Sequence, residues 1–296
     1  MAEFKSITDT ETVDKRYVNK VIVYLESPED VAILAERWFF DIGENLEFKP
    51  SDQGYSSTGG CFGVCQSVEI DRSNGVIAFG IVDRDALLSK RLWDLIWETD
   101  NVQYLAAAPF GPYIRPLIRW EIENYLIAPE VVEEYLADHE HGRTQRSSDD
   151  IIIELLKDCD ALIPMMAACA LLHEHGVSAP GDGYLKQEFR TELEECLCTQ
   201  YISSKLKDIK DWQEKFENNK CRVQLFDNQS IEGKERLESL LRIIDGKRLL
   251  ERLKYRHNVK DDPRFHLARK IREVKCVPDE IKLYVFSLVS NKHDTV

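Results

Sequence analysis

The stretch Val76-Ile77-Ala78-Phe79-Gly80-Ile81-Val82-Asp83-Arg84-Asp85 joins a short, apolar, partly β-branched run to a pair of acids. A second stretch, Val21-Ile22-Val23-Tyr24-Leu25-Glu26, has the same form and ends in one acid. Such runs are typical of strands buried on both faces of a parallel sheet. Ligands of open α/β sheets bind beyond the carboxyl ends of the strands, so we expect Glu26, Asp83 and Asp85 to lie side by side there.

The order of elements predicts an α/β fold with a doubly wound, mostly parallel sheet, followed by a helical domain. The boundary is expected between residues 127 and 128, so that residues 1–127 carry the sheet and residues 128–296 the helices. Strands are expected at 20–26, 46–48, 76–82, 102–106 and 114–120, with helices at 28–40, 65–70 and 87–97. In the second part, helices are expected at 129–137, 149–173, 183–198, 202–217, 234–244, 246–256, 263–274 and 279–290, loops at 137–150 and 177–183, and one strand at 221–226.

The amino-terminal residues are polar and lack an apolar signal core, and the longest apolar stretch, 161–172, is too short to cross a bilayer and contains Pro164. We therefore expect a cytoplasmic protein with no membrane association. The eight cysteines lack zinc-ligand spacing and are interpreted as reduced thiols.

Charge is unevenly distributed along the chain. The net charge is −14, but the segment from Lys205 to Lys282 contains 21 Lys/Arg and 15 Asp/Glu, a net of +6. This segment is a candidate phosphate-facing surface. Solvated helix faces or a surface for an acidic partner protein are the alternatives. Lys247 follows Asp245-Gly246 at the start of an expected helix, where the helix amino terminus favours an anion, although a solvated lysine fits the same pattern. The candidate RNA-binding residues are Lys247, Arg248, Arg252 and Arg256.

The three acids predict a metal site. Three adjacent carboxylates repel one another, so their site must bind a cation or have raised pKa values. An oxygen-only set without His or Cys indicates Mg²⁺ or Mn²⁺. The Asp-x-Asp spacing places Asp83 and Asp85 on one face, where they can share a metal, while a turn after the strand is the structural alternative. Asp30 forms a Ser27-x-x-Asp30 capping box and is favoured as a helix cap over a ligand.

These motifs resemble the TOPRIM fold. The resemblance rests on Glu26 and Asp30 after one strand, Gly59-Gly60, and Gly80-Ile81-Val82-Asp83-Arg84-Asp85 after another. The string Trp120-Glu121-Ile122-Glu123-Asn124-Tyr125-Leu126, followed by Pro129-Glu130, is similar to bacterial TOPRIM proteins paired with an ABC-type ATPase, in particular the nuclease effectors of PARIS anti-phage systems.

The resemblance implies a Mg²⁺-dependent endoribonuclease that cleaves tRNA and blocks translation. It further implies that an ABC-type ATPase restrains the nuclease until its release, which permits a homodimer. Glu26, Asp83 and Asp85 would hold the metal and act in catalysis, with Glu123 as a fourth acid or, alternatively, a strand-end hydrogen-bond acceptor. Two other functions remain open: a DNA nuclease of an OLD-like defence system, and a catalytically silent regulatory subunit of the ATPase.

Overall fold

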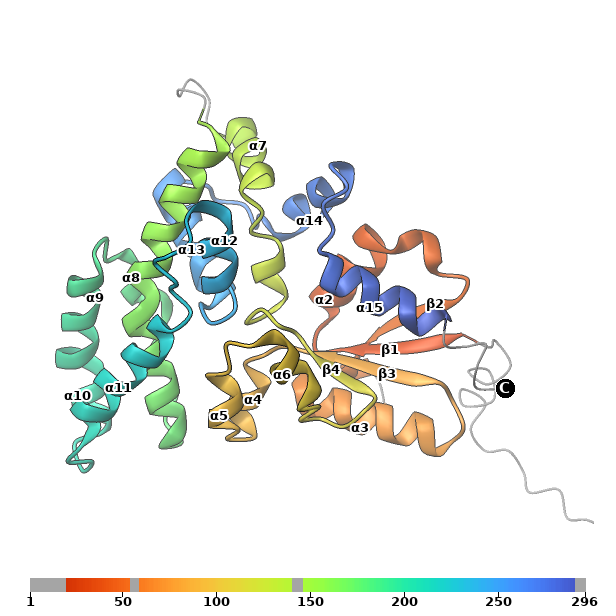
Figure 1. Ribbon diagram of the computed structural model, residues 1–296, viewed down its shortest axis with the longest axis horizontal. Helices are drawn as coiled ribbons and strands as arrows, with labels where there is room; N and C mark the ends of the chain where they lie inside the picture. The colour runs from red at the N-terminus through yellow and green to blue at the C-terminus, as the bar shows by residue number, and fades with distance from the viewer. Residues whose placement is uncertain (1–19, 54–58, 140–145, 291–296) are drawn as a thin grey trace, which may run out of the picture. The chain divides into compact units, whose positions relative to one another are not determined.

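The computed structural model describes residues 20–53, 59–139 and 146–290, and the chain divides into two compact units (Figure 1). Of the described residues, the first unit comprises 20–53, 59–82, 108–116 and 272–290, and the second comprises 83–107, 117–139 and 146–271. The units therefore do not follow the expected boundary at residues 127 and 128, because the chain passes between them several times. Part of the loop expected at residues 137–150 lies outside the described residues.

The first unit contains a four-stranded, all-parallel sheet of order β2-β1-β3-β4. All five residues of β1 are buried, as expected for a strand covered on both faces. In the β1–β3 pair, Ile22 lies opposite Ala78 and Tyr24 lies opposite Gly80. The α/β class is thus confirmed. The strands are β1 Val21–Leu25, β2 Leu46–Pro50, β3 Ala78–Val82 and β4 Ile114–Pro116.

Helices of the first unit pack on both faces of this sheet. Figure 1 shows α3 on one side of the strands and α15 on the other. The cap of α2 is the expected capping box: Asp30 N–H donates to Ser27 Oγ (3.2 Å), and Ser27 N–H donates to Asp30 Oδ2 (3.0 Å). Asp30 is therefore confirmed as a capping residue. The helices are α2 Pro28–Ile33, continued by a π-helical turn at Leu34–Trp38, 3₁₀ turns at Phe40–Ile42 and Ser51–Gln53, α3 Gly60–Ser73 and α15 Asp279–Ser290.

Gly80 determines how closely α3 approaches the sheet. A Cβ atom at this position would lie 2.5 Å from Val64 Cγ1 of α3 and 3.2 Å from Ile114 Cγ1 of β4. Both distances are shorter than van der Waals contact, so only glycine allows this packing. The absence of a side chain at Gly80 therefore lets β3 pack closely against both α3 and β4.

The second unit is helical, and its centre is α8 Ser148–Glu174, a long, largely buried helix against which α7, α9, α11, α12 and α13 pack. Among the described residues, no helix is both long and apolar enough to cross a membrane. The other elements are α4 Ala86–Ser89, α5 Trp93–Ile96, α6 Asn101–Ala106, a 3₁₀ turn η4 Ile122–Tyr125, α7 Pro129–His139, a 3₁₀ turn η5 Asp182–Lys186, α9 Arg190–Cys196, a π-helical turn Leu197–Ile202, α10 Ser203–Lys205, α11 Trp212–Gln224, α12 Gly233–Leu240, α13 Gly246–His257 and α14 Arg264–Glu273.

Two expected strands are wrong. Residues 102–106 belong to helix α6, because the Asp100 side chain accepts from the N–H groups of Val102 (2.7 Å) and Gln103 and caps the helix. Residues 221–226 begin within helix α11, in which Val223 is buried and Cys221 is exposed. In both cases an apolar, β-branched residue on a helix mimics a strand pattern.

The remaining elements agree with the expectations in position but not always in extent. The helix expected at 87–97 is divided into α4 and α5, and Arg91 between them has a positive φ of 55°. The strand expected at 114–120 ends at Pro116, and the single helices expected at 183–198 and 202–217 are each broken into shorter elements.

We predict that Gly80→Ala lowers the free energy of unfolding by about 1–3 kcal/mol, because the added methyl group must displace Val64 or the strand. Urea unfolding monitored by circular dichroism measures this change. Gly183→Ala is the matched control, since nothing lies within 4 Å of the position that its Cβ would take. Equal stability of the two variants would contradict the close packing of α3 on β3.

Candidate metal centre

Glu26 directly follows β1, and the start of α3 fixes its backbone. The Gly60 N–H donates to the Glu26 carbonyl oxygen (3.2 Å), and so does the Ser51 hydroxyl (3.2 Å). Gly60 has a φ of +73°, a conformation that favours glycine, and a Cβ there would lie 3.7 Å from Glu26 Oε2. The Gly59-Gly60 pair therefore lets the chain turn into α3 directly beside the Glu26 carboxylate.

Asp83 and Asp85 follow β3, and Arg84, the residue between them, is anchored to backbone carbonyl groups of the second unit. The fully buried Arg84 side chain donates to the carbonyl oxygens of Ile118 (3.0 Å), Ile96 (3.0 Å), Leu95 and Glu98. Burial lowers the pKa of Arg84 to about 10. Because Arg84 is held by carbonyl groups, the two acids that flank it are directed away from this anchor.

The backbone also orients Asp83 itself. Its Oδ1 atom accepts from the Ile122 N–H (3.2 Å), and the residue is only 9% exposed. The N–H groups of Arg84 and Asp85 both donate to the Trp120 carbonyl oxygen (2.9 and 3.3 Å). The segment after β3 is thus fixed to the segment that precedes η4.

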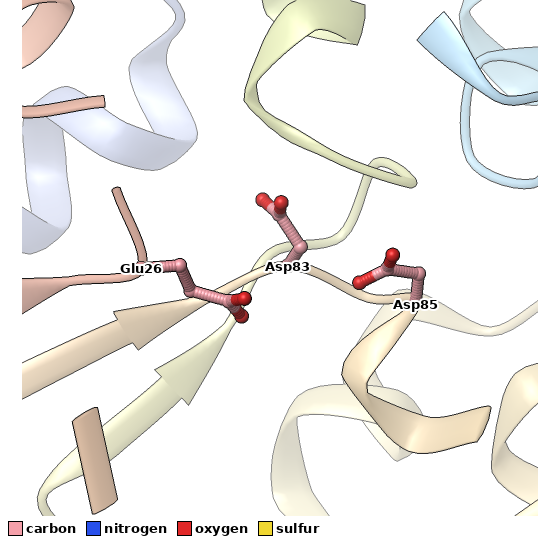
Figure 2. Close-up of side chains that lie close together, drawn as sticks. All are labelled: Glu26, Asp83 and Asp85. Atoms are coloured by element: carbon pink, nitrogen blue, oxygen red, sulfur yellow. The ribbon is translucent and has the colours of Figure 1, made fainter. Parts of the chain in front are cut away.

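Glu26, Asp83 and Asp85 form one acidic cluster. Each offers a carboxylate oxygen, and these oxygens lie within 4.8 Å of one another. In Figure 2 the carboxylates of Glu26 and Asp85 point toward each other, while that of Asp83, which lies between them along the view, points toward the top. The parallel pairing of β1 with β3 accounts for this proximity, since the strands end side by side and the acids follow them directly.

The donor set of this cluster fits a hard divalent cation. Three carboxylates without histidine or cysteine match the preference of Mg²⁺ or Mn²⁺ for oxygen ligands. Three protein ligands also leave coordination positions for water and a phosphate oxygen, as is usual for Mg²⁺. Glu26, Asp83 and Asp85, the three ligands predicted from the sequence, can therefore hold a metal ion.

A second group of charges surrounds the amino terminus of α13. The Lys247 N–H donates to Glu121 Oε1 (2.6 Å), and the Lys247 ammonium donates to Glu121 Oε2 (3.0 Å). The Asp245 side chain caps the same helix by accepting from the Arg248 N–H (2.9 Å). The anion position expected at this helix amino terminus is thus filled by the protein's own carboxylates.

Burial and neighbouring charges make Glu121 difficult to ionise. Burial raises the pKa of Glu121 well above its usual value, and the charges of Asp245, Glu123 and Asp85 raise it further, while Lys247 opposes them. Burial lowers the pKa of Lys247, but Glu121, Glu123 and Asp83 together raise it above its usual value. Lys247 therefore holds its proton firmly, between the Glu121 carboxyl group, which resists ionisation, and Glu123.

Glu123 lies outside the acidic cluster, because its charge is met by cations. Its Oε1 atom accepts from Arg264 Nη1 (3.3 Å), and its Oε2 atom lies 3.7 Å from the Lys247 ammonium. The side chain is 2% exposed. Glu123 is therefore not part of the cluster of Glu26, Asp83 and Asp85. It pairs with Lys247 and Arg264 instead.

The expected RNA-binding face of α13 is mostly internal. Arg252 is only 4% exposed and donates to Asp158 Oδ1 (2.9 Å) and to three carbonyl groups, so the expectation that it faces RNA phosphates is wrong. Arg256 pairs with Asp158 and Glu154, and Arg248 donates to Cys169 Sγ (2.8 Å) and to a carbonyl group. Of the four candidates, Lys247 is the most exposed, at 57% of its side chain.

Sequence reasoning missed the roles of Glu121 and Arg264. Glu121 lies in the quoted Trp120–Leu126 string, two residues before Glu123, and this acid-x-acid spacing was the available signal. No local pattern connects Arg264 or Lys247 to that string, because more than 120 residues separate Lys247 from Glu121.

We predict that the acidic cluster binds Mn²⁺ or Mg²⁺ and that Glu26→Gln, Asp83→Asn and Asp85→Asn each weaken this binding. Saturating metal should stabilise the unaltered chain by about 2.7 kcal/mol at 100 times Kd, and the variants by much less. Without metal the variants should not lose stability, because each substitution removes repulsion. Thermal unfolding with and without metal measures both effects. The exposed Asp208→Asn is the control, and an equal metal response in all variants would exclude the cluster as the binding site.

We also predict that Glu121 makes the protein less stable as pH rises. Its pKa is raised in the folded state, so the folded protein binds its proton more tightly than the unfolded chain does, and stability falls above about pH 4.5 by up to about 1.4 kcal/mol per pH unit. Urea unfolding at several pH values should show that Glu121→Gln flattens this decline. Glu69→Gln, on the exposed face of α3, should leave the slope unchanged. Parallel curves for all three proteins would rule out this contribution of Glu121.

Comparison with known proteins found no matching family model, no matching curated protein and no matching solved structure.

Proposed function

We propose that this chain is a divalent-metal-dependent phosphodiesterase of the TOPRIM fold that cleaves tRNA. The observation that carries the proposal is the acidic cluster itself: Glu26, Asp83 and Asp85, within 4.8 Å of one another after two adjacent parallel strands. A binding-only protein has no physical reason to keep three repelling carboxylates in one place. The cofactor in this proposal is Mg²⁺, with Mn²⁺ as a substitute.

The chemistry follows from what these residues can do. When bound, the metal would supply charge to neutralise a backbone phosphate and would lower the pKa of an attacking water. Asp83 and Asp85 would hold the ion, and the Ile122 N–H keeps the Asp83 carboxylate in position. Glu26 would complete the metal site or accept a proton from the attacking water. Arg84 has no contact with substrate in this scheme and only positions the two aspartates.

Lys247 is the candidate cation for a substrate phosphate. Its side chain is partly exposed, and it contacts Glu121 and Glu123, the two residues that flank Ile122, whose N–H donates to Asp83 Oδ1. Within the protein, its ammonium contacts Glu121 Oε2 (3.0 Å) and Glu123 Oε2 (3.7 Å). A phosphate oxygen could take the place of a carboxylate, because both accept from an ammonium group and a helix N–H.

The tRNA substrate and the biological role rest on the family resemblance. We propose that the chain is an effector of the AriB type in a PARIS anti-phage system, toxic through loss of tRNA. An ABC-type ATPase would restrain it, and release would permit a homodimer. Purification of the tagged chain from its native host tests the partner, since an ABC-type ATPase should co-purify with it and a dimer should remain after the ATPase dissociates.

We predict that the purified chain degrades total tRNA with Mg²⁺ and loses this activity in EDTA. Asp83→Asn, Asp85→Asn and Glu26→Gln should each lower the rate at least 100-fold, because they remove a metal ligand or proton acceptor, whereas Asp208→Asn should cut at the unaltered rate. Gel electrophoresis of tRNA, ribosomal RNA and plasmid DNA after incubation measures cleavage and substrate class together.

Each other outcome selects a different function. Metal-dependent cutting of plasmid DNA alone would indicate an OLD-like DNA nuclease. Absence of all cutting, in a chain that still binds an ABC-type ATPase, would indicate a regulatory subunit. Cutting that survives substitution of all three acids would remove the acidic cluster from the mechanism.

A further inference from the structure

A cavity of about 340 Å³ lies within the second unit, beside the carboxyl-terminal half of α13. The middle of α8 and the end of η5 with the residues after it supply its other walls, and none of the three clustered acids lines it. Its volume is near the lower end of the range for small-molecule sites, about 300–1,000 Å³. The lining residues used below are Asp158, Lys186, Glu188, Arg252, Tyr255 and Arg256.

An exposed aromatic ring forms one part of the cavity wall. Tyr255 is 63% exposed, whereas Leu253 and His257, two residues before and after it on α13, are buried. The helix therefore packs against its surroundings through other residues, and the Tyr255 side chain is open to solvent. A ring in this position can stack on a planar ligand held in the cavity.

The two arginines at the cavity are already neutralised by the protein. Arg252 and Arg256 both pair with Asp158, and Arg256 also pairs with Glu154. The remaining N–H groups of the Arg252 guanidinium donate to three backbone carbonyl groups. These arginines fix the cavity wall, and Arg252 has no donor left for a ligand.

Lys186 differs from the arginines, because its charge is not met by an acid. Its side chain is exposed, and within the described part of the chain its ammonium forms no ion pair with a carboxylate. Glu188, two residues further on, pairs with Lys157 (2.7 Å). The Lys186 ammonium lies 6.0 Å from the centroid of the Tyr255 ring. The cavity therefore has a cation available for an anion beside an exposed aromatic ring.

Helix α13 connects this cavity with the residues near the acidic cluster. Tyr255 lies eight residues after Lys247 on the helix, which corresponds to about 12 Å along its axis. Lys247 is 57% exposed and contacts Glu121, and the next residue, Ile122, donates its N–H to Asp83 Oδ1. A nucleic-acid strand with a phosphate at Lys247 would reach the cavity by following α13.

We propose that this cavity holds one unpaired nucleotide of the RNA substrate, whose base stacks on Tyr255 and whose phosphate contacts Lys186. The assignment of this RNA as substrate rests on the proposed nuclease function. Aromatic side chains stack on bases that are free of pairing, whereas duplex RNA keeps its bases stacked on one another. The substrate is therefore single-stranded where it follows α13. Because stacking tolerates every base and Arg252 has no spare donor, the site accepts any base.

A peptide with an aromatic or acidic side chain is the other occupant that a ring and an ammonium group suit. Nucleic acid is favoured, because Lys247 at the other end of the same helix is the candidate cation for a substrate phosphate. A partner protein is therefore treated as an alternative outcome of the test.

The test measures binding without cleavage, with the Glu26→Gln variant in EDTA. Fluorescence anisotropy with a labelled RNA dodecamer, single-stranded or annealed to its complement, gives Kd for both forms. We expect the single strand to bind about tenfold more tightly than the duplex, because only its bases are free to stack on Tyr255. Unlabelled AMP should compete only weakly, since it makes no contact at Lys247.

Substitutions in this background separate stacking from the phosphate contact. Tyr255→Phe keeps the ring and should retain the affinity within about twofold, whereas Tyr255→Leu should weaken it about tenfold. Lys186→Gln should reduce the slope of log Kd against log salt concentration by about 0.7, the loss of one phosphate contact. The matched control is Lys207→Gln, an exposed lysine between α10 and α11, which should leave the slope unchanged. Circular dichroism checks the fold of each variant.

Several results would overturn the proposal. Equal affinity of Tyr255→Leu and Tyr255→Phe would exclude stacking, and equal slopes for Lys186→Gln and Lys207→Gln would exclude the phosphate contact. Equal binding of single strand and duplex would exclude an unpaired nucleotide. AMP that binds as tightly as the dodecamer would assign the cavity to a free nucleotide.

Two further outcomes separate this proposal from the others. If Tyr255→Leu binds RNA normally but no longer co-purifies with an ABC-type ATPase, the surface belongs to the partner protein and the nucleotide site is wrong. Failure of the nuclease proposal is recognised separately: the chain then cuts no nucleic acid with metal, while binding that depends on Tyr255 and Lys186 still supports the nucleotide site.

Discussion

The parallel pairing of β1 with β3 is the constraint on which the acidic cluster depends. Because these strands run in the same direction in adjacent positions, the residues that follow them emerge at the same edge of the sheet. Within this pair, Gly80 lies opposite Tyr24, and its missing side chain lets α3 pack closely against β3. The close packing at Gly80 and the acidic cluster thus lie on the same strand, one in its middle and the other just beyond its carboxyl end.

The carboxylates near the ends of these strands divide into two groups by the source of their counter-charge. Glu121 and Glu123 are neutralised from within the protein, by Lys247 and Arg264. Glu26, Asp83 and Asp85 share a cluster of oxygens suited to a divalent ion. Because Asp85 and Asp83 influence the pKa values of Glu121 and Lys247, a cation bound by the aspartates would also change the balance of charge around Lys247.

The basic segment shows why counting charges does not identify a binding surface. Its net charge of +6 is real, but Arg252 and Arg256 serve Asp158, and Arg248 serves Asp245 and Cys169. Guanidinium groups satisfy several acceptors at once, so they are well suited to fixing a segment such as the end of η5, where Arg252 donates to the carbonyl oxygens of Leu185 and Gln187.

The sequence by itself determined the elements whose signals are local. The buried strands Val21–Leu25 and Ala78–Val82, the Ser27–Asp30 cap and the acids after each strand could be predicted, because a few neighbouring residues encode each of them. The strand pattern failed at Val102 and Val223, where helix capping and burial decided otherwise. Only the tertiary structure decided that Glu121 would pair with Lys247, that Glu123 would meet Arg264 and that Arg252 would be buried on Asp158. Those partners lie about a hundred residues apart, and no periodicity in a sequence records which distant charges will share one buried space.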